Sequence, residues 1–395
     1  MVSSKVLQLT NKFIACVLLI ILTTMVFETL AFRNVDVYES SMKEQHERWI
    51  TRHNRMYENE VEKERRYQIY KNNVERIEQW NKNAARNNLS YRLGVNKFAD
   101  LNEDEFHAVR NGYKRATPRL AKSVRGGVLP SSPSLSPLTY EGLSDVVVPS
   151  SMDWREKGAV TRVKDQGQCG RMIMLSKGEL VSLSEQQIID CDERIQHGCK
   201  GGYAAQAFSF IQQNNGLVTE AAYPYRGAGG RCRKPTRATT NNNTARIGGY
   251  ERVPLGDEEA LLQAVAKRPV SAAIDASRFE FWFYSSGVYT GPCATELNHE
   301  VAIVGYGVSE DGVKYWLVKN SWGESWGEDG YMRMQRDVDE GEEGLCGIAL
   351  DASYPIAPSS DQIQYYSNLS FRQCVPLTLC CILNLSILIW GIYVI

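Results

Sequence analysis

The chain has 395 residues, of which 43% are hydrophobic and 23% are charged. These fractions are typical of a soluble globular protein and exclude a mainly disordered one. The 45 basic and 46 acidic residues leave a formal net charge of −1, so no basic excess indicates nucleic acid as a partner. The length is sufficient for about two domains, each with its own core.

Residues 1–31 have the pattern of a secretory signal peptide. Lys5 and Lys12 precede an apolar run over Phe13–Phe27, and Thr29-Leu30-Ala31 follows as a small-residue cleavage site. An uncleaved signal anchor is the alternative interpretation. Secretion implies an oxidising compartment, so we expect the ten cysteines to be disulfide partners first of all.

Residues 41–120 are charged, rich in helix formers and free of cysteine. A set of side chains recurs there every four or three positions, which predicts one face of a single long helix. The set is Glu62, Arg66, Tyr70, Asn73, Ile77 and Asn81, with Ile69, Val74 and Trp80 widening the apolar side. Further on, Asn102 is a predicted helix cap, with Glu105 as the third helical residue.

Residues 121–147 are rich in glycine, proline and serine and are expected to form a linker. The next region, residues 148–358, is rich in cysteine, glycine and aromatic residues and contains four informative segments. Gln166 lies in a turn-like segment before Cys169, and Gly201-Gly202 lie in a tight loop whose bare backbone can approach a ligand. His299 starts a strand-like run, and Asn320 ends another.

With these features in this order, the chain resembles the papain-like cysteine proteases, and among them the plant senescence-type members most. The helix over Glu62–Asn81 and the segment Gly94–Asp100 resemble the E-R-F-N-I-N and G-N-F-D motifs of the family's inhibitory propeptide, with Tyr70 where phenylalanine is usual. The resemblance implies an α+β fold with two domains, a helical left domain and a β-barrel-like right domain. An α-helical inhibitory prodomain is expected to precede them.

The resemblance also implies roles for individual residues. His299 would be the acid/base, Asn320 its orienting partner and Gln166 the oxyanion donor. Trp322 would shield the His–Asn hydrogen bond. Gly201 and Gly202 would bind extended substrate, and Tyr203, Ala273 and Asp351 would line the main specificity pocket. The implied disulfides are Cys169–Cys199, Cys191–Cys232 and Cys293–Cys346.

The segment that should carry the nucleophilic cysteine is missing. In the family, Q-C-G continues into S-C-W-A-F and a long helix, whereas here Gly170 is followed directly by Arg171 and the pattern resumes at Gly178. About 12 residues are absent, which is on the order of 18 Å of helix. Met172, at the nominal position, cannot form a thiolate, and recruiting Cys169 would leave its disulfide partner unpaired. Glu300 is a second departure, because a small residue is usual after the histidine, and its carboxylate is expected to raise the pKa of His299 or to crowd the cleft.

Three functional hypotheses remain open from the sequence. The gene encodes a working cysteine endopeptidase of which this chain is a mis-spliced form or an error in the gene model. Alternatively, the chain is an inactive protease-like protein that binds peptides, proteases or inhibitors. As a third hypothesis, its prodomain inhibits related proteases. The implied partners are protein or peptide substrates, the chain's own propeptide and cystatin-like inhibitors, and no cofactor or metal is implied.

The tail over residues 359–395 extends beyond the family pattern. Val375–Ile395 is mostly apolar and long enough to span a bilayer, although Asn384 interrupts it. A cryptic tail or a gene-model error is the alternative. Asn88, Asn242 and Asn368 lie in N-glycosylation sequons. Vacuole, lysosome-like compartment and extracellular space all agree with the predicted signal.

Overall fold

The computed structural model describes residues 37–110, 147–167, 169, 181–192, 199, 201–233, 244–338 and 341–358. They form two compact units. The first contains the described residues up to Lys82 together with Val95–Asn102, and the second contains Asn83–Gly94 and the described residues from Glu103 onward. The predicted signal (1–31), almost all of the predicted linker (121–147) and the tail (359–395) lie outside the described residues. Within the described ranges, no helix combines the length and the apolar character needed to cross a membrane.

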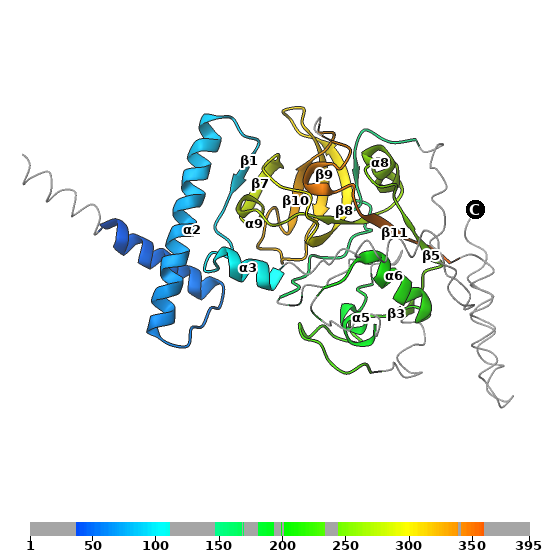
Figure 1. Cartoon of the computed structure of the whole chain (residues 1–395), viewed down its shortest axis with the longest axis horizontal. Helices are drawn as coiled ribbons and strands as arrows, with labels where there is room; N and C mark the ends of the chain where they lie inside the picture. The colour runs from blue at the N-terminus through cyan, green and yellow to red at the C-terminus, as the bar shows by residue number, and fades with distance from the viewer. Residues whose placement is uncertain are drawn as a thin grey trace, which may run out of the picture. The chain divides into compact units, whose positions relative to one another are not determined.

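The first unit is built on two helices. One covers residues 37–52, and α2 (Glu60–Arg86) crosses it, as the two blue helices in Figure 1 show. Asn59 caps α2, because its side-chain oxygen accepts a hydrogen bond from the backbone N–H of Glu62 at 2.9 Å. The single long helix predicted across Glu62–Asn81 is therefore confirmed.

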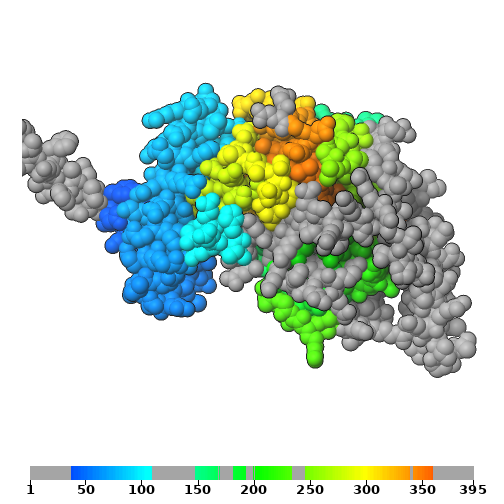
Figure 2. Space-filling view, in the orientation of Figure 1, coloured from blue at the N-terminus to red at the C-terminus, as the bar shows by residue number. Residues whose placement is uncertain are grey.

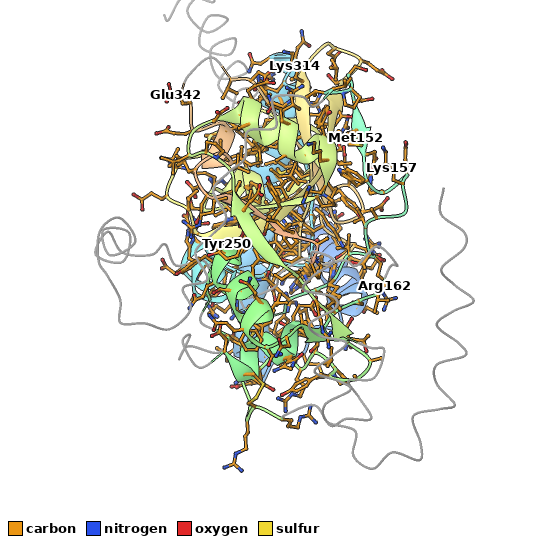
Figure 3. The ribbon with its side chains drawn as sticks, turned by 90° about the vertical axis from the view of Figure 1, so that its right-hand side faces the viewer. Met152, Lys157, Arg162, Tyr250, Lys314 and Glu342 are labelled. Atoms are coloured by element: carbon orange, nitrogen blue, oxygen red, sulfur yellow. A yellow bond between two sulfur atoms is a disulfide. The ribbon has the colours of Figure 1, made fainter. Side chains whose placement is uncertain are left out.

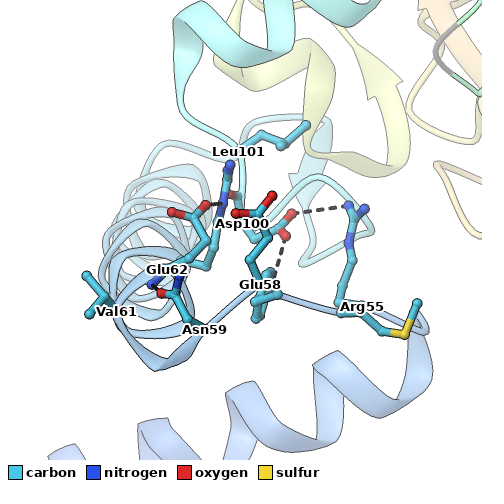
Figure 4. Close-up of a pocket in the computed structure, with 10 residues that line it drawn as sticks. Arg55, Glu58, Asn59, Val61, Glu62, Asp100 and Leu101 are labelled. Carbon is cyan, nitrogen blue, oxygen red and sulfur yellow. Dashed lines mark hydrogen bonds and ion pairs between the residues drawn. The ribbon is translucent and has the colours of Figure 1, made fainter.

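One face of α2 holds the segment Val95–Asn102 by its backbone. Arg66 donates to the carbonyl oxygen of Asp100 at 2.8 Å, and the amide of Asn73 donates to the carbonyls on both sides of Asp100, at 2.9 and 3.0 Å. The buried carboxylate of Asp100 accepts from Arg55 and Tyr57, each at 3.1 Å, beside a cavity of about 720 Å³ (Figure 4). The predicted polar positions of the helix thus bind a second segment.

The second unit contains one nine-stranded sheet in the order β1-β7-β10-β9-β8-β6-β11-β5, with β2 paired to β8. Neighbouring strands are antiparallel except β10 and β7. The strands are β1 (Tyr91–Leu93), β2 (Met152–Asp153), β5 (Gly249–Arg252), β6 (Val270–Ile274), β7 (Tyr284–Tyr289), β8 (His299–Val308), β9 (Lys314–Lys319), β10 (Tyr331–Gln335) and β11 (Ala352–Ile356).

A smaller helical region of the same unit has its own core. It contains α5 (Glu185–Cys191), α6 (Ala204–Gln213) and the two-stranded sheet β3 (Leu217–Val218) with β4 (Thr244–Ala245). Its buried core is made by Leu183, Ile188, Ala204, Ala207, Phe208, Phe210, Ile211, Leu217 and Ala245. In the space-filling view, its green residues and the yellow-to-orange residues of the sheet occupy separate regions of the visible face (Figure 2).

The remaining helices pack beside the sheet: α8 (Glu258–Lys267), α9 (Phe279–Trp282) and the 3₁₀ turn η2 (Leu345–Gly347). Buried side chains fill the interior, whereas the exposed side chains of Lys157 and Arg162 lie at the margin of Figure 3. The expected α+β architecture, with a helical region beside a barrel-like sheet, is confirmed. Among the described residues, β1 and β5 are the two edge strands of this barrel-like sheet.

Two elements that precede residue 148 belong to this second unit. β1 pairs antiparallel with β7, so that Tyr91 lies opposite Gly287. α3 (Glu103–Arg110) begins directly after Asn102, as predicted, and its buried Phe106 stacks on Trp282 with a centroid distance of 4.0 Å. The predicted prodomain, here called the prosegment, therefore extends the sheet by one strand and adds an aromatic contact.

The close approach of β1 to β7 requires glycine at position 287. A Cβ on Gly287 would lie 2.0 Å from the carbonyl oxygen of Ser90, and its φ of +91° disfavours other residues. We expect Gly287→Ala to separate the two strands and to accelerate amide hydrogen exchange in residues 90–93. The loss of stability should exceed the roughly 1 kcal/mol expected from backbone strain alone.

Gly312→Ala is the matched control. Gly312 has a φ of +79°, but no atom lies within 4 Å of the position that an added methyl group would occupy, so this variant carries the strain without the collision. Equal exchange in residues 90–93 for both variants would contradict the proposed steric requirement.

Candidate active site

A histidine and an asparagine meet where two neighbouring strands end. His299 is the first residue of β8, and Asn320 directly follows β9. Because these strands are antiparallel, with Ala302 opposite Lys319, the start of one lies near the end of the other. Nε2 of His299 and Oδ1 of Asn320 are 2.8 Å apart, and both side chains are buried.

The hydrogen bonds of Asn320 determine which ring nitrogen carries a proton. Its Oδ1 also accepts from the backbone N–H of Ser321 at 2.7 Å, which identifies this atom as the carbonyl oxygen of the amide. Nε2 of His299 must therefore be the donor in the His–Asn bond. Nδ1 is then the ring nitrogen available for proton exchange with a reacting group.

A tryptophan covers the pair. The ring of Trp322 is fully buried, and its centroid lies 4.7 Å from that of His299. Trp326 packs edge-on against it at 5.2 Å, and Phe106 of α3 packs edge-on at 5.5 Å. This aromatic cover excludes water and so strengthens the hydrogen bond beneath it.

Gln166 lies beside Asn320 through contacts with the intervening Ser321. The backbone N–H of Gln166 donates to the carbonyl of Ser321 at 2.9 Å, and the hydroxyl of Ser321 donates to Oε1 of Gln166. Nε2 of Gln166 is buried and has no hydrogen-bond partner among the described residues. Buried donors are normally satisfied, so an amide held in this way suits a negatively charged oxygen brought by a ligand.

A buried lysine anchors the segment that carries Gln166. Nζ of Lys319 donates to the carbonyl and hydroxyl oxygens of Thr161, at 2.6 and 3.2 Å, and to the carbonyl of Arg162 at 3.1 Å. Burial, aided by the positive charge of Lys164, lowers the pKa of Lys319 to about 8. Lys164 itself pairs with the buried Glu185 of α5 at 2.6 Å. These contacts join residues 161–166 to both the sheet and the helical region.

The six cysteines of residues 148–358 form the three pairs implied by the resemblance: Cys169–Cys199, Cys191–Cys232 and Cys293–Cys346. The first pair links the segment of Gln166 to the loop that leads into Gly201. Every cysteine between residues 148 and 358 is therefore oxidised, and none carries a thiol. The junction at Gly170–Arg171 and Met172 lie outside the described residues.

The predicted substrate-binding residues fall into two groups. Gly201, Gly202 and Tyr203 directly precede α6, and Gly201 has a φ of +98° that glycine tolerates. Ala273 of β6 lies opposite Glu300 of β8 and donates its N–H to the carbonyl of Asp351 at 2.9 Å. Ala273 and Glu300 are therefore paired residues of β6 and β8 whose side chains share one face, and Asp351, directly before β11, lies beside Ala273.

Glu300 interacts on this face with groups other than His299. Its carboxylate accepts from the hydroxyl of Ser271 at 2.8 Å. Burial is the main reason that the pKa of Glu300 rises to about 8, and the nearby Asp351 raises it further, whereas Ser271 and the backbone N–H of Ala204 lower it. Because successive residues of a strand point to opposite faces, Glu300 and His299 are directed apart. The carboxylate of Glu300 is therefore not directed at His299. Because it lies on the face of Ala273 and Asp351, crowding of the cleft at these predicted pocket residues stays a prediction.

Comparison with known proteins agrees with this geometry. Residues 148–356 match the model of the papain family cysteine proteases, and residues 46–106 match the cathepsin propeptide inhibitor domain. The chain belongs to the papain family. Its two matched regions are arranged as in a zymogen, with the propeptide domain before the peptidase domain.

The chain aligns with relatives and with a solved structure over nearly the full length of each of them. The senescence-specific cysteine protease SAG12 of Arabidopsis thaliana is 45% identical over 80% of this chain and 91% of its own length. Vignain of Ricinus communis is 44% identical over 89% of this chain and 96% of its own length. The recombinant stem bromelain precursor is 41% identical with a TM-score of 0.68, and covers 81% of this chain and 100% of its own.

Two features of this papain-family site were not predicted from the sequence. One is the bond from Ser321 to Gln166, which depends on two segments 155 positions apart. The other is the pairing of β1 with β7, since a three-residue strand leaves almost no periodic signal. Ser321 directly follows Asn320, and its polar side chain was the only sign in the sequence of the bond to Gln166.

The raised pKa of Glu300 makes stability depend on pH. Between the ordinary glutamate range and pH 8, the folded chain keeps a proton that the unfolded chain releases. Stability should therefore fall as pH rises through this window, by at most about 1.4 kcal/mol per pH unit. We expect Glu300→Gln to match the unmodified chain at pH 5 and to be more stable at pH 8, measured by urea unfolding.

Glu296→Gln provides the control, because it removes an exposed carboxylate from the segment just before His299. It should leave the pH dependence unchanged. If Glu300→Gln and the unmodified chain lose stability equally between pH 5 and pH 8, the raised pKa of Glu300 is wrong.

Proposed function

We propose that this chain is a papain-family zymogen whose cleft retains the His–Asn pair and oxyanion donor for Cys-His-Asn proteolysis but does not hydrolyse peptides. The observation that carries the proposal is the combination of an assembled His299–Asn320 pair at 2.8 Å with the oxidation of all six cysteines in the peptidase domain. The chain then acts as a protease-like protein that binds peptides or inhibitors through the remaining cleft.

The chemistry of the missing step supports inactivity. In a cysteine protease the thiolate attacks the peptide carbonyl, and the imidazole transfers the proton to the leaving amine. His299 and Gln166 supply the proton transfer and the oxyanion contact, but neither forms a covalent acyl intermediate. Cys169 lies nearest in sequence to the expected position, and its sulfur is already bonded to Cys199. Reducing that bond would also release the loop before Gly201.

A second candidate function is inhibition of related proteases by the prodomain. The observation that favours it is that β1 and α3 contact the peptidase part of the second unit through backbone pairing with β7 and the Phe106–Trp282 stack. These contacts use main-chain groups and one aromatic ring. A relative with a similar strand and tryptophan would be recognised in the same way.

The remaining assignments follow from the sequence and the family. We place the chain in the secretory pathway, with a vacuole or lysosome-like compartment or the extracellular space as its destination. Cystatin-like inhibitors are proposed partners of the cleft, and membrane attachment through Val375–Ile395 is proposed for the tail.

The proposal of inactivity is tested by two assays on the purified, processed chain. We expect no hydrolysis of fluorogenic peptides and no labelling of the peptidase domain by a thiol-directed epoxide, because all six cysteines of residues 148–358 are in disulfides. Mass spectrometry would locate any label. Labelling of Cys169, or hydrolysis that depends on His299, would contradict the proposal.

A graft tests whether the rest of the site is intact. Residues 171–177 are replaced by the corresponding nucleophile-bearing segment of Ricinus communis vignain. We expect peptide hydrolysis, and we expect His299→Ala in the graft to reduce it by about 100-fold or more. A graft whose nucleophilic cysteine is replaced by serine is the control. A folded graft with no hydrolysis would show that the retained residues are not competent.

Sequencing the transcript across codons 168 to 178 tests whether the missing segment is absent from the message or only from this chain. A message that encodes the missing segment would make the inactive chain a splice product or a gene-model error of an active protease gene. A message that lacks the segment supports a dedicated non-hydrolytic protein.

A further inference from the structure

Glu300 joins the sheet to the helical region at the predicted specificity pocket. It is the second residue of β8, and its carboxyl group accepts hydrogen bonds from the hydroxyl of Ser271 on β6, at 2.8 Å, and from the backbone N–H of Ala204, the first residue of α6. The first N–H groups of a helix have no partner inside the helix, and the side chain of the N-cap residue, Tyr203, makes no capping hydrogen bond. Glu300 therefore supplies a cap to α6 from a distant strand.

The residues next to this carboxyl group have small side chains. Ala273 lies opposite Glu300, and Ser271 shares its face because it lies two positions earlier on the same strand. Ala204, Ser271 and Ala273 are all buried. Protein interiors are close-packed, with few voids larger than a water molecule, so the side chain of Glu300 takes the space that these small residues leave. A second large side chain enters this space only if Glu300 moves out.

The protonation state of Glu300 suits a side chain that stays inside the protein. Burial, aided by the nearby Asp351, raises its pKa to about 8. The group is therefore mostly neutral at pH 6, and its hydrogen bonds satisfy it where it lies. A neutral carboxyl group attracts a basic side chain far less than a carboxylate does. Glu300 therefore does not by itself make this pocket selective for arginine or lysine.

We infer that Glu300 fills the predicted main specificity pocket with its own side chain, so that the cleft binds peptides with a small side chain at this position and rejects large ones. The inference deepens the proposed function, since it rests on the binding of peptides in the remaining cleft. Forcing extra carbon atoms into space that is already packed costs binding free energy, and moving Glu300 away breaks its hydrogen bonds to Ser271 and Ala204. Either route penalises a leucine or an arginine more than an alanine.

The binding test uses the processed chain at pH 6. Three fluorophore-labelled peptides share one sequence apart from a single position, which is alanine, leucine or arginine, and their affinities are measured by fluorescence polarisation. We expect the alanine peptide to bind at least about tenfold more tightly than the other two, which is the discrimination that pocket size provides. Glu300→Gln keeps the size of the side chain and can accept from the N–H of Ala204, so it should preserve this order.

Glu300→Ala removes the side chain that fills the pocket. We expect the affinity for the leucine peptide, relative to that for the alanine peptide, to rise by about tenfold or more in this variant. Comparing this ratio between variants isolates the contact at position 300. Glu300→Ser is a second opening variant, for the case that loss of the α6 cap prevents folding of the first. An unchanged ratio in a folded opening variant, or tightest binding of the leucine or arginine peptide to the unmodified chain, would overturn the inference.

Crystals of the full chain provide a measurement that needs no bound peptide. They are soaked in isobutanol, whose carbon skeleton matches the leucine side chain. We expect isobutanol beside Ala273 in Glu300→Ala and not in the unmodified chain or in Glu300→Gln. If no peptide binds to the processed chain, peptide binding as the proposed function fails, and this soak alone decides the inference. Isobutanol beside Ala273 in the unmodified chain, or in none of the three crystals, would overturn it.

Discussion

The antiparallel pairing of β8 with β9 is the constraint on which the rest of the site depends. It sets Ala302 opposite Lys319, so His299 at the start of one strand reaches Asn320 just past the end of the other. The segment with Gln166 is then fastened to the same strand end by Ser321 and by the buried ammonium of Lys319. A shift of one residue in this register would turn every side chain of the strand to the opposite face and separate the three groups.

Buried polar groups carry out different tasks in the two units. Lys319 and Lys164 hold the Gln166 segment to the sheet and the helical region, and their charges are compensated by carbonyl oxygens and by Glu185. Burial and the neighbouring Asp351 raise the pKa of Glu300, so Glu300 keeps its proton to higher pH than an ordinary glutamate. In the first unit, by contrast, His46 prefers to remain neutral. Raised and lowered pKa values occur in both units, since the pKa of Asp100 in the first unit is raised and that of Lys319 in the second is lowered.

The prosegment contacts the peptidase domain both by main-chain pairing and by aromatic side chains. β1 adds an edge strand to β7, and a backbone that approaches so closely requires Gly287. Such pairing protects an otherwise open sheet edge. The Phe106–Trp282 stack and the edge contact of Phe106 with Trp322 link α3 to the aromatic cover over His299. The same phenylalanine therefore participates in both the prosegment contact and the shielding of the catalytic-type pair.

By itself, the sequence determined the long α2 helix, the start of α3 and, through the family resemblance, the fold class and the disulfide partners. These features depend on periodic spacing and on residue types that are readable along the chain. The same resemblance implied that no cysteine of residues 148–358 remains outside the three pairs. Only the tertiary structure decided that Ser321 orients Gln166, that Glu300 turns toward Ser271 instead of His299, and that His46 is enclosed by aromatic rings. Each of these contacts joins segments that are distant in sequence or depends on which face of a strand or helix is buried, and folding alone brings those surfaces together.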